Sequence, residues 1–268
     1  MTSITASSSA YSPPPLVVWD FDWSLVNENS DTFIVKALDP TGSILAAAER
    51  KLSEGMQWTA LMDWVAGQLS AAGHDAEAME AALRRIPVLG RSLAAVETAR
   101  SHGAEQRILS DANALYIRWT LRALGIADAF SVIETNGAAV DPAGRLHISP
   151  HQPPHAAHGC RLCPPNLCKG AVLERWLREG EGEGRARRCA YVGDGGGDFC
   201  PALRLRRGDA LFARQPPHDG LLRKCRAGGG VEAAITEWSE RDDGAALHDG
   251  LRDFLVNGKR EGGGCGIV

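Results

Sequence analysis

The chain has no uninterrupted run of about 18 apolar residues, so no membrane-spanning segment is expected. It also has no surplus of basic residues, because 29 Lys and Arg stand against 33 Asp and Glu. The resulting net charge of −4 argues against general nucleic-acid binding. Residues 1–15 lack both a basic start and an apolar stretch, and they are predicted to form a disordered tail and not a secretory signal. A small ligand is therefore the expected partner.

The composition is that of an ordinary globular protein, with 44% hydrophobic and 23% charged residues. A length of 268 residues allows one core, or one core with a smaller inserted module. Seven cysteines form an odd set in a sequence for which no signal peptide is expected. We therefore expect reduced thiols and a cytoplasmic protein.

Short apolar runs recur along the chain and alternate with helical patterns. The first, residues 16–21, follows three prolines and carries Asp20 near its end, as a buried parallel strand can. Similar runs lie at residues 106–110, 130–134, 189–193 and 209–213. Helical spacing is found at residues 92–102, 112–124, 170–178 and 199–205. This alternation predicts an α/β fold with a doubly wound parallel sheet, whose ligand site lies at the carboxyl ends of the strands.

Residues 32–88 interrupt the alternation, because they carry apolar residues at helical spacing and no convincing strand. We predict that they form a small helical cap, inserted into a core made of residues 16–31 and 89–240. A cap in this position could exclude water and select the substrate. Residues 140–148 have the turn chemistry of a hairpin. The polar, glycine-rich residues 241–268 are predicted to be a flexible tail.

Acidic side chains follow two of the predicted strands. Asp20 and Asp22 could supply a nucleophile and a proton-transfer group, although a solvated acidic turn is the alternative. Residues 193–198 read Gly-Asp-Gly-Gly-Gly-Asp, in which Asp194 and Asp198 can hold a hard cation such as Mg²⁺. The alternative for these acids is a loop that caps the next helix. The two segments together indicate a metal-dependent phosphohydrolase.

Ser110 and Lys169 are candidate phosphate ligands. Ser110 ends a predicted strand, where it could bind phosphate, cap the following helix, or do both. Lys169 begins a predicted helix, where a cation opposes the helix dipole. Neutralising a phosphate is one reason for a lysine in that position, and a surface lysine is the alternative.

Cys160, Cys163 and Cys168 form a C-x-x-C with a third cysteine five residues later, downstream of several histidines. These residues have the ligand types of a structural Zn²⁺ site, and packed or free thiols are the alternative. Cys265 opens four C-terminal residues with the outline of a prenylation box. The terminal Val favours a chance match.

The ordered motifs resemble those of the haloacid dehalogenase superfamily of phosphohydrolases with a helical cap. More closely, they resemble the phosphoethanolamine/phosphocholine phosphatase family, whose plant-type members include enzymes assigned to pyrophosphate or thiamine monophosphate. The matching segments are Asp20-Phe21-Asp22, Asn29-Ser30-Asp31, Ser110-Asp111-Ala112-Asn113, Cys163-Pro164-Pro165-Asn166-Leu167-Cys168-Lys169 and Gly193-Asp194-Gly195. The chain departs from the family pattern at Trp23, where a smaller or charged residue is usual.

The resemblance implies a role for each motif in phosphoryl transfer. Asp20 is expected to be the nucleophile that forms an aspartyl-phosphate, and Asp22 the general acid and then base. Ser110 and Lys169 are expected to bind the transferring phosphoryl group. The implied Mg²⁺ ligands are Asp20, the backbone carbonyl of Asp22, Asp194 and Asp198.

The resemblance also implies that Asp31 and Asp111 face an amine head group. Two carboxylates near a cation suit phosphocholine or phosphoethanolamine better than pyrophosphate. Pyrophosphate, thiamine monophosphate and pyridoxal phosphate remain alternative substrates for the same chemistry. A non-catalytic protein that holds zinc on this fold is an alternative of another class.

Overall fold

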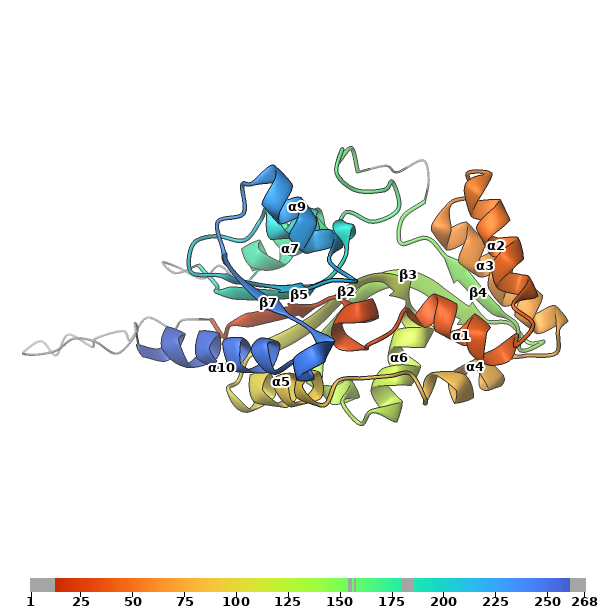
Figure 1. Ribbon diagram of the computed structural model, residues 1–268, viewed down its shortest axis with the longest axis horizontal. Coiled ribbons are helices and arrows are strands. Elements are labelled where there is room, and N and C mark those ends of the chain that lie inside the picture. The colour runs from red at the N-terminus through yellow and green to blue at the C-terminus, as the bar shows by residue number, and fades with distance from the viewer. Residues whose placement is uncertain (1–12, 154–155, 157, 180–185, 261–268) are drawn as a thin grey trace, which may run out of the picture.

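The computed structural model describes residues 13–153, 156, 158–179 and 186–260. Its centre is a seven-stranded sheet in the order β4-β3-β2-β1-β5-β6-β7 (Figure 1). The strands are β1 (Leu16–Trp19), β2 (Glu105–Asn113), β3 (Val132–Val140), β4 (Leu146–Ser149), β5 (Cys189–Gly193), β6 (Ala210–Arg214) and β7 (Ala234–Trp238). All pairings are parallel except that of β3 with β4, which forms the predicted hairpin. The predicted α/β fold is confirmed.

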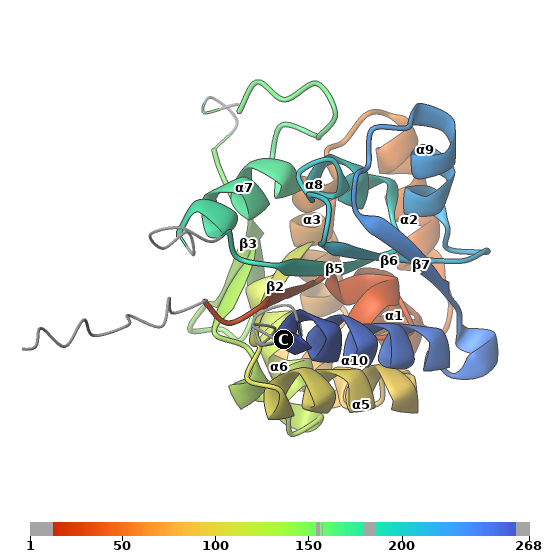
Figure 2. The same cartoon turned by 90° about the vertical axis from the view of Figure 1, so that its left-hand side faces the viewer.

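Helices cover both faces of the sheet (Figures 1 and 2). In Figure 1, α7 and α9 lie above it, and α5, α6 and α10 lie below it. The helices are α1 (Ser30–Leu38), α2 (Ser43–Ser53), α3 (Trp58–Ala71), α4 (Ala76–Leu83), α5 (Gly90–Ser101), α6 (Ala114–Ala123), α7 (Lys169–Glu179), α8 (Phe199–Ala202), α9 (Gly220–Gly228) and α10 (Ala245–Arg260). None of the helices in the described ranges is long and apolar enough to cross a membrane.

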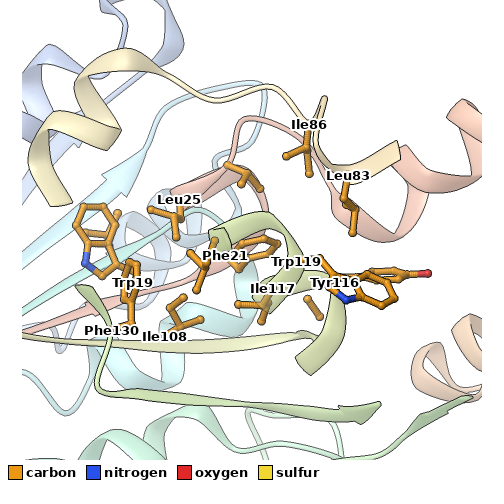
Figure 3. Close-up of a cluster of buried hydrophobic side chains, with 14 of the residues drawn as sticks. Trp19, Phe21, Leu25, Leu83, Ile86, Ile108, Tyr116, Ile117, Trp119 and Phe130 are labelled. Carbon is orange, nitrogen blue, oxygen red and sulfur yellow. The ribbon is translucent and has the colours of Figure 1, made fainter. Parts of the chain in front are cut away.

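The central strand β1 is buried on both faces. Val17 and Trp19 belong to the core below the sheet, whereas Leu16 and Val18 belong to a second core on the other side. Alternate residues of a strand point to opposite faces, so an uninterrupted apolar run suits this position. Figure 3 shows Trp19 among the side chains of the first core. Its indole N–H donates to Gln106 Oε1 at 3.0 Å, which satisfies the buried polar group.

The region predicted as a cap holds α1, α2, α3 and α4 and no strand. These helices gather at one end of the sheet, where α3 packs against β4 (Figure 1). Helix α1 begins directly after the first acidic motif, and Asn29 caps it by accepting a hydrogen bond from the amide of Thr32 at 2.9 Å. The helical insert therefore starts at the same edge of the sheet as the acids.

The prediction of a flexible tail over residues 241–268 is wrong for its first part. Residues 245–260 form α10, which lies along α5 (Figure 2). Leu247, Leu251 and Leu255 recur every fourth residue and are buried, as is Phe254. The polar residues between them occupy the exposed side of an amphipathic helix. They make the overall composition of the segment polar, so its composition alone did not predict a helix. Residues 1–12 and Cys265 lie outside the described residues. The predictions of a disordered N-terminal tail and of a chance prenylation match therefore stay predictions.

Candidate active site

The acidic motifs meet at the carboxyl edge of the three central strands. Strand β1 lies between β2 and β5 in parallel register, with Trp19 opposite Ile108 on one side and Val192 on the other. Asp20 follows the end of β1, and its amide donates to the carbonyl of Val192 at 2.9 Å. Asp194 follows the end of β5. Parallel strands that end together place these carboxylates in one crevice.

Lys169, the first residue of α7, holds two of the acids together. Its Nζ lies 2.9 Å from Asp20 Oδ1 and 2.9 Å from Asp198 Oδ1. The hydroxyl of Tyr191 also donates to Asp198 Oδ1, at 2.7 Å. Burial by itself would lower the pKa of the Lys169 ammonium, but the carboxylates of Asp198 and Asp20 outweigh it and hold that pKa well above its ordinary value. The lysine is therefore a fixed positive charge inside the site.

Asp20, Asp194 and Asp198 each place a carboxylate oxygen within 4.8 Å of the others. The loop after β5 shapes this group, because Asp198 Oδ2 accepts hydrogen bonds from the amides of Asp194 at 3.2 Å and Gly195 at 3.1 Å. Ser24 Oγ donates to Asp194 Oδ1 at 3.4 Å. Hard carboxylate oxygens grouped in this way are the ligands that Mg²⁺ prefers.

The charge of this group also fits a divalent cation. Burial raises the pKa of Asp20 well above its ordinary value, and the negative charge of Asp198 raises it further. Burial and Asp198 likewise raise the pKa of Asp194 to about 8. One lysine does not balance the buried Asp20 and Asp198 together with the partly buried Asp194, and a bound divalent cation would supply the missing positive charge.

The Asp22 carboxylate lies outside that three-acid group. Its Oδ1 accepts from the amide of Ser30 at 2.9 Å and its Oδ2 accepts from Asn29 Nδ2 at 3.3 Å. Burial raises the pKa of Asp22 well above its ordinary value, and the nearby Asp31 adds to this effect. A carboxyl group with a raised pKa keeps its proton to higher pH, as general acid catalysis requires. Metal binding by the Asp22 backbone carbonyl stays a prediction.

Ser110 and Asp111 lie near the end of β2, where the pairing with β3 is irregular. Ser110 is fully buried, and its Oγ accepts a hydrogen bond from the amide of Ala112 at 3.2 Å. A hydroxyl oxygen that accepts one bond still has a proton to donate, as binding a phosphate oxygen requires. The side chain of Asn136 donates to the Asp111 carbonyl at 2.6 Å and holds this turn against β3.

A cavity of about 280 Å³ opens beside Lys169, and Trp58 and Asp111 line it. Trp58 is the first residue of α3, and its indole N–H donates to Asp31 Oδ2 at 3.0 Å. Burial raises the pKa of Asp31 to about 7, although the hydrogen bond from Trp58 opposes this shift. Asp31, Trp58 and Asp111 also line a narrower void next to the cavity. Lys169 and Asp111 therefore border the same cavity, and Asp31 lies at the adjoining narrow void.

Trp23 does not line this cavity. Its backbone has φ 55°, a left-handed conformation at the point where the chain turns away from β1. The ring stacks on His218, with centroids 3.5 Å apart, and the guanidinium of Arg214 lies 5.5 Å from its centroid. The unusual residue of the first motif thus packs against the end of β6 and the segment between β6 and α9.

Three site residues carried no clear signal in the sequence. Tyr191 lies inside an apolar strand, where a tyrosine is read as core. Asn29 stands among the motif residues, but its contact with Asp22 depends on how the chain turns. Trp58 has helical spacing typical of packing, and only the structure places its N–H on Asp31.

A Rossmann-like sheet with a nucleophile candidate after its first strand, a lysine and a distal acidic loop defines a haloacid dehalogenase-type phosphohydrolase. The structure of a probable phosphoserine phosphatase from Vibrio cholerae has this fold, with a TM-score of 0.59 and 13% identity, over 93% of this chain and 67% of that one.

Sequence comparison gives the family. The chain belongs to the Putative Phosphatase family, which matches residues 15–251. It is 36% identical to inorganic pyrophosphatase 2 of Arabidopsis thaliana over 85% of this chain and 80% of that protein. It is 31% identical to the human phosphoethanolamine/phosphocholine phosphatase over 86% of each. The predicted family is confirmed, and the chain is a phosphatase, so the non-catalytic alternative is dropped.

Proposed function

We propose that this phosphatase hydrolyses a small phosphomonoester with a cationic head group, phosphocholine or phosphoethanolamine, with Mg²⁺ as cofactor. The observation that carries the proposal is that a lysine lies at one end of the site and two further carboxylates lie at the other. Lys169 stands at one end, between Asp20 and Asp198. Asp111 and the Trp58–Asp31 pair stand beside the adjoining void.

In the proposed reaction, an Asp20 carboxylate oxygen attacks phosphorus, and the bond from phosphorus to the leaving oxygen breaks. Asp22 gives its proton to that leaving oxygen, which departs as the alcohol. A water molecule then attacks the phosphorus of the aspartyl-phosphate, and Asp22 takes a proton from it. The bond between phosphorus and the Asp20 oxygen breaks, which releases inorganic phosphate and restores both carboxyl groups to their starting states.

The remaining residues stabilise the charge of the transferring group. Lys169 and the Ser110 hydroxyl are proposed to hold its oxygens, and the fixed ammonium favours the charge that develops on them. Asp20, Asp194 and Asp198 would hold Mg²⁺, and the ion would neutralise phosphate charge when bound. The Tyr191 hydroxyl positions Asp198 through its 2.7 Å hydrogen bond.

Head-group selection is proposed to depend on Asp31 and Asp111. An ammonium group in the cavity lined by Trp58 and Asp111 gains attraction from Asp111 and from Asp31, which accepts the hydrogen bond of the Trp58 indole. The indole face of Trp58 suits a quaternary ammonium. The second phosphate of pyrophosphate would bring negative charge to the same acids. The similarity to an Arabidopsis protein named as a pyrophosphatase supports pyrophosphate as the second candidate. Thiamine monophosphate and pyridoxal phosphate are further candidates.

The test is phosphate release from phosphocholine, phosphoethanolamine, thiamine monophosphate, pyridoxal phosphate and pyrophosphate, at matched concentrations and with or without Mg²⁺. The expected result is the highest kcat/KM on the first two substrates, with release dependent on Mg²⁺. A clear preference for pyrophosphate would overturn the proposed substrate and leave the chemistry intact.

The Asp20→Asn variant tests the chemistry separately, because it removes the nucleophile with little change in shape. It should lose turnover on every substrate while its circular dichroism spectrum stays that of the parent chain. Most of the activity surviving in this variant would overturn the aspartyl-phosphate mechanism.

A further inference from the structure

We propose that Cys160, Cys163, Cys168 and Cys200 bind one structural zinc ion beside the active site. Their Sγ atoms lie within 4.8 Å of one another. The first three belong to the segment before α7, and Cys200 lies in α8. The structure therefore adds a fourth thiol, distant in the sequence, to the three that the C-x-x-C pattern indicated.

The spacing of the sulfur atoms matches a metal site. Cys200 Sγ lies 3.8 Å from Cys160 Sγ and 3.8 Å from Cys168 Sγ. In a tetrahedral site with Zn–S bonds of about 2.3 Å, neighbouring sulfur atoms are about 3.8 Å apart. A disulfide requires about 2.05 Å, and all four residues are free cysteines. Two of the sulfur–sulfur distances therefore have the tetrahedral value, and four cysteine thiolates are the ligands of closed, structural zinc sites.

One contact of the cluster favours a thiolate at Cys168. The amide of Ala171, in the first turn of α7, donates to Cys168 Sγ at 3.4 Å. Amide donors and the positive end of a helix stabilise a sulfur that carries negative charge. Cys200 approaches the backbone so closely that a Cβ on Gly170 would collide with its Sγ. The glycine at this point of α7 makes room for the fourth ligand.

The position of the cluster connects it to catalysis. Cys168 directly precedes Lys169, and Cys200 follows Asp198 by two residues. A zinc ion that joins these cysteines would tie the start of α7 to the acidic loop. It would thereby fix the ion pair between Lys169 and Asp198. Its sulfur ligands keep it distinct from the oxygen-lined Mg²⁺ site.

The test is the metal content of the full chain, purified under reducing conditions and measured by elemental mass spectrometry. About one zinc per chain is expected for the parent, and less than about 0.1 for Cys163→Ser, because three thiolates bind zinc far less tightly. Cys163 is only partly buried, in the segment before α7, so its replacement by serine is compatible with folding. Cys225→Ser, which removes a buried cysteine of α9 outside the cluster, is the matched control and should keep the ion.

A second readout is independent of both activity and the zinc supply during expression. Co²⁺ added to the metal-free parent chain should give thiolate-to-cobalt absorption and the visible bands of tetrahedral cobalt, and Cys163→Ser should lose them. Equal zinc in parent and Cys163→Ser would overturn the proposal. So would a parent chain that binds neither zinc nor cobalt, or a disulfide within the cluster found by mass spectrometry.

Discussion

The indole N–H of Trp58 donates a 3.0 Å hydrogen bond to Asp31 Oδ2, which joins α3 to the first turn of α1. This bond favours the ionised carboxylate, while burial raises the pKa of Asp31 to about 7. The charge of the proposed head-group site therefore depends on a tryptophan that the helical insert supplies.

Replacing Trp58 by Phe should weaken binding of cationic substrates. The variant keeps an aromatic ring but loses the donor, at a cost of about 1 kcal/mol, or roughly a fivefold rise in KM for phosphocholine. Steady-state kinetics against phenyl phosphate, whose leaving group is uncharged, give the reference. An equal rise in KM for both substrates would count against the head-group role.

The preference for phosphocholine over phenyl phosphate should grow as the pH rises through 7. Asp31 attracts an ammonium only when ionised, and its pKa of about 7 places that change near neutrality. The ratio of the two kcat/KM values between pH 6 and 8 isolates Asp31 from titrations that both substrates share. In Asp31→Asn the ratio should be low and independent of pH.

Without Mg²⁺, the protein should lose stability as the pH rises towards 8. The pKa of Asp194 is about 8 in the folded chain and about 4 when unfolded. Between these values the folded state holds more protons, so deprotonation favours unfolding. Mg²⁺ binds the ionised carboxylates, and its stabilising effect should be larger at pH 8.5 than at pH 6. Thermal melting in buffers free of added Mg²⁺, with Asp194→Asn as the control, measures both trends.

Gly193→Ala should cost activity without unfolding the chain. A Cβ at this position would lie 2.7 Å from the carboxyl carbon of Asp198, which must then move away from Lys169. A displacement of this kind lowers kcat/KM by about 10- to 100-fold. At Gly195 the nearest atom to an added Cβ is 3.8 Å away, so Gly195→Ala should retain activity close to that of the parent. Similar kinetics for the two variants would contradict this account.

Leu251→Ala should destabilise the fold by about 2–5 kcal/mol, because it leaves a cavity between α10 and the sheet. Leu251 is fully buried, whereas Leu52 is 45% exposed. Leu52→Ala removes the same atoms from the surface and should cost less than about 0.5 kcal/mol. Urea unfolding of the two variants compares them directly. A small effect at Leu251 would restore the view of this segment as a loose tail.

Sequence reasoning succeeded where a local pattern determines a local structure. Asp20 follows an apolar run that is buried on both sides, and such a run predicts a central parallel strand with the acid at its carboxyl end. The same logic located Asp194 after β5. Parallel strands then bring both acids to one edge, so these elements of the site follow from the strand order alone.

Other contacts depend on how distant segments pack, which no local pattern records. Cys200 joins the cysteine cluster across a crossover, and Tyr191 reaches Asp198 from inside a strand. The α10 helix was missed for a different reason. Its buried apolar residues occur at every fourth position among polar ones, so the average composition of the segment is polar and concealed the helix. The strands are short continuous apolar runs, which an average composition does not conceal.

The position of β1 in the middle of the sheet has a consequence for the chain during synthesis. Asp20 is synthesised well before its partners Lys169 and Asp198, which lie far downstream of it in the sequence. Until β5 and α7 dock, the nascent protein carries a reactive carboxylate without its counter-charge. Every truncated product that ends before the acidic loop should therefore be inert, and catalytic ability should appear in one step once that loop is in place.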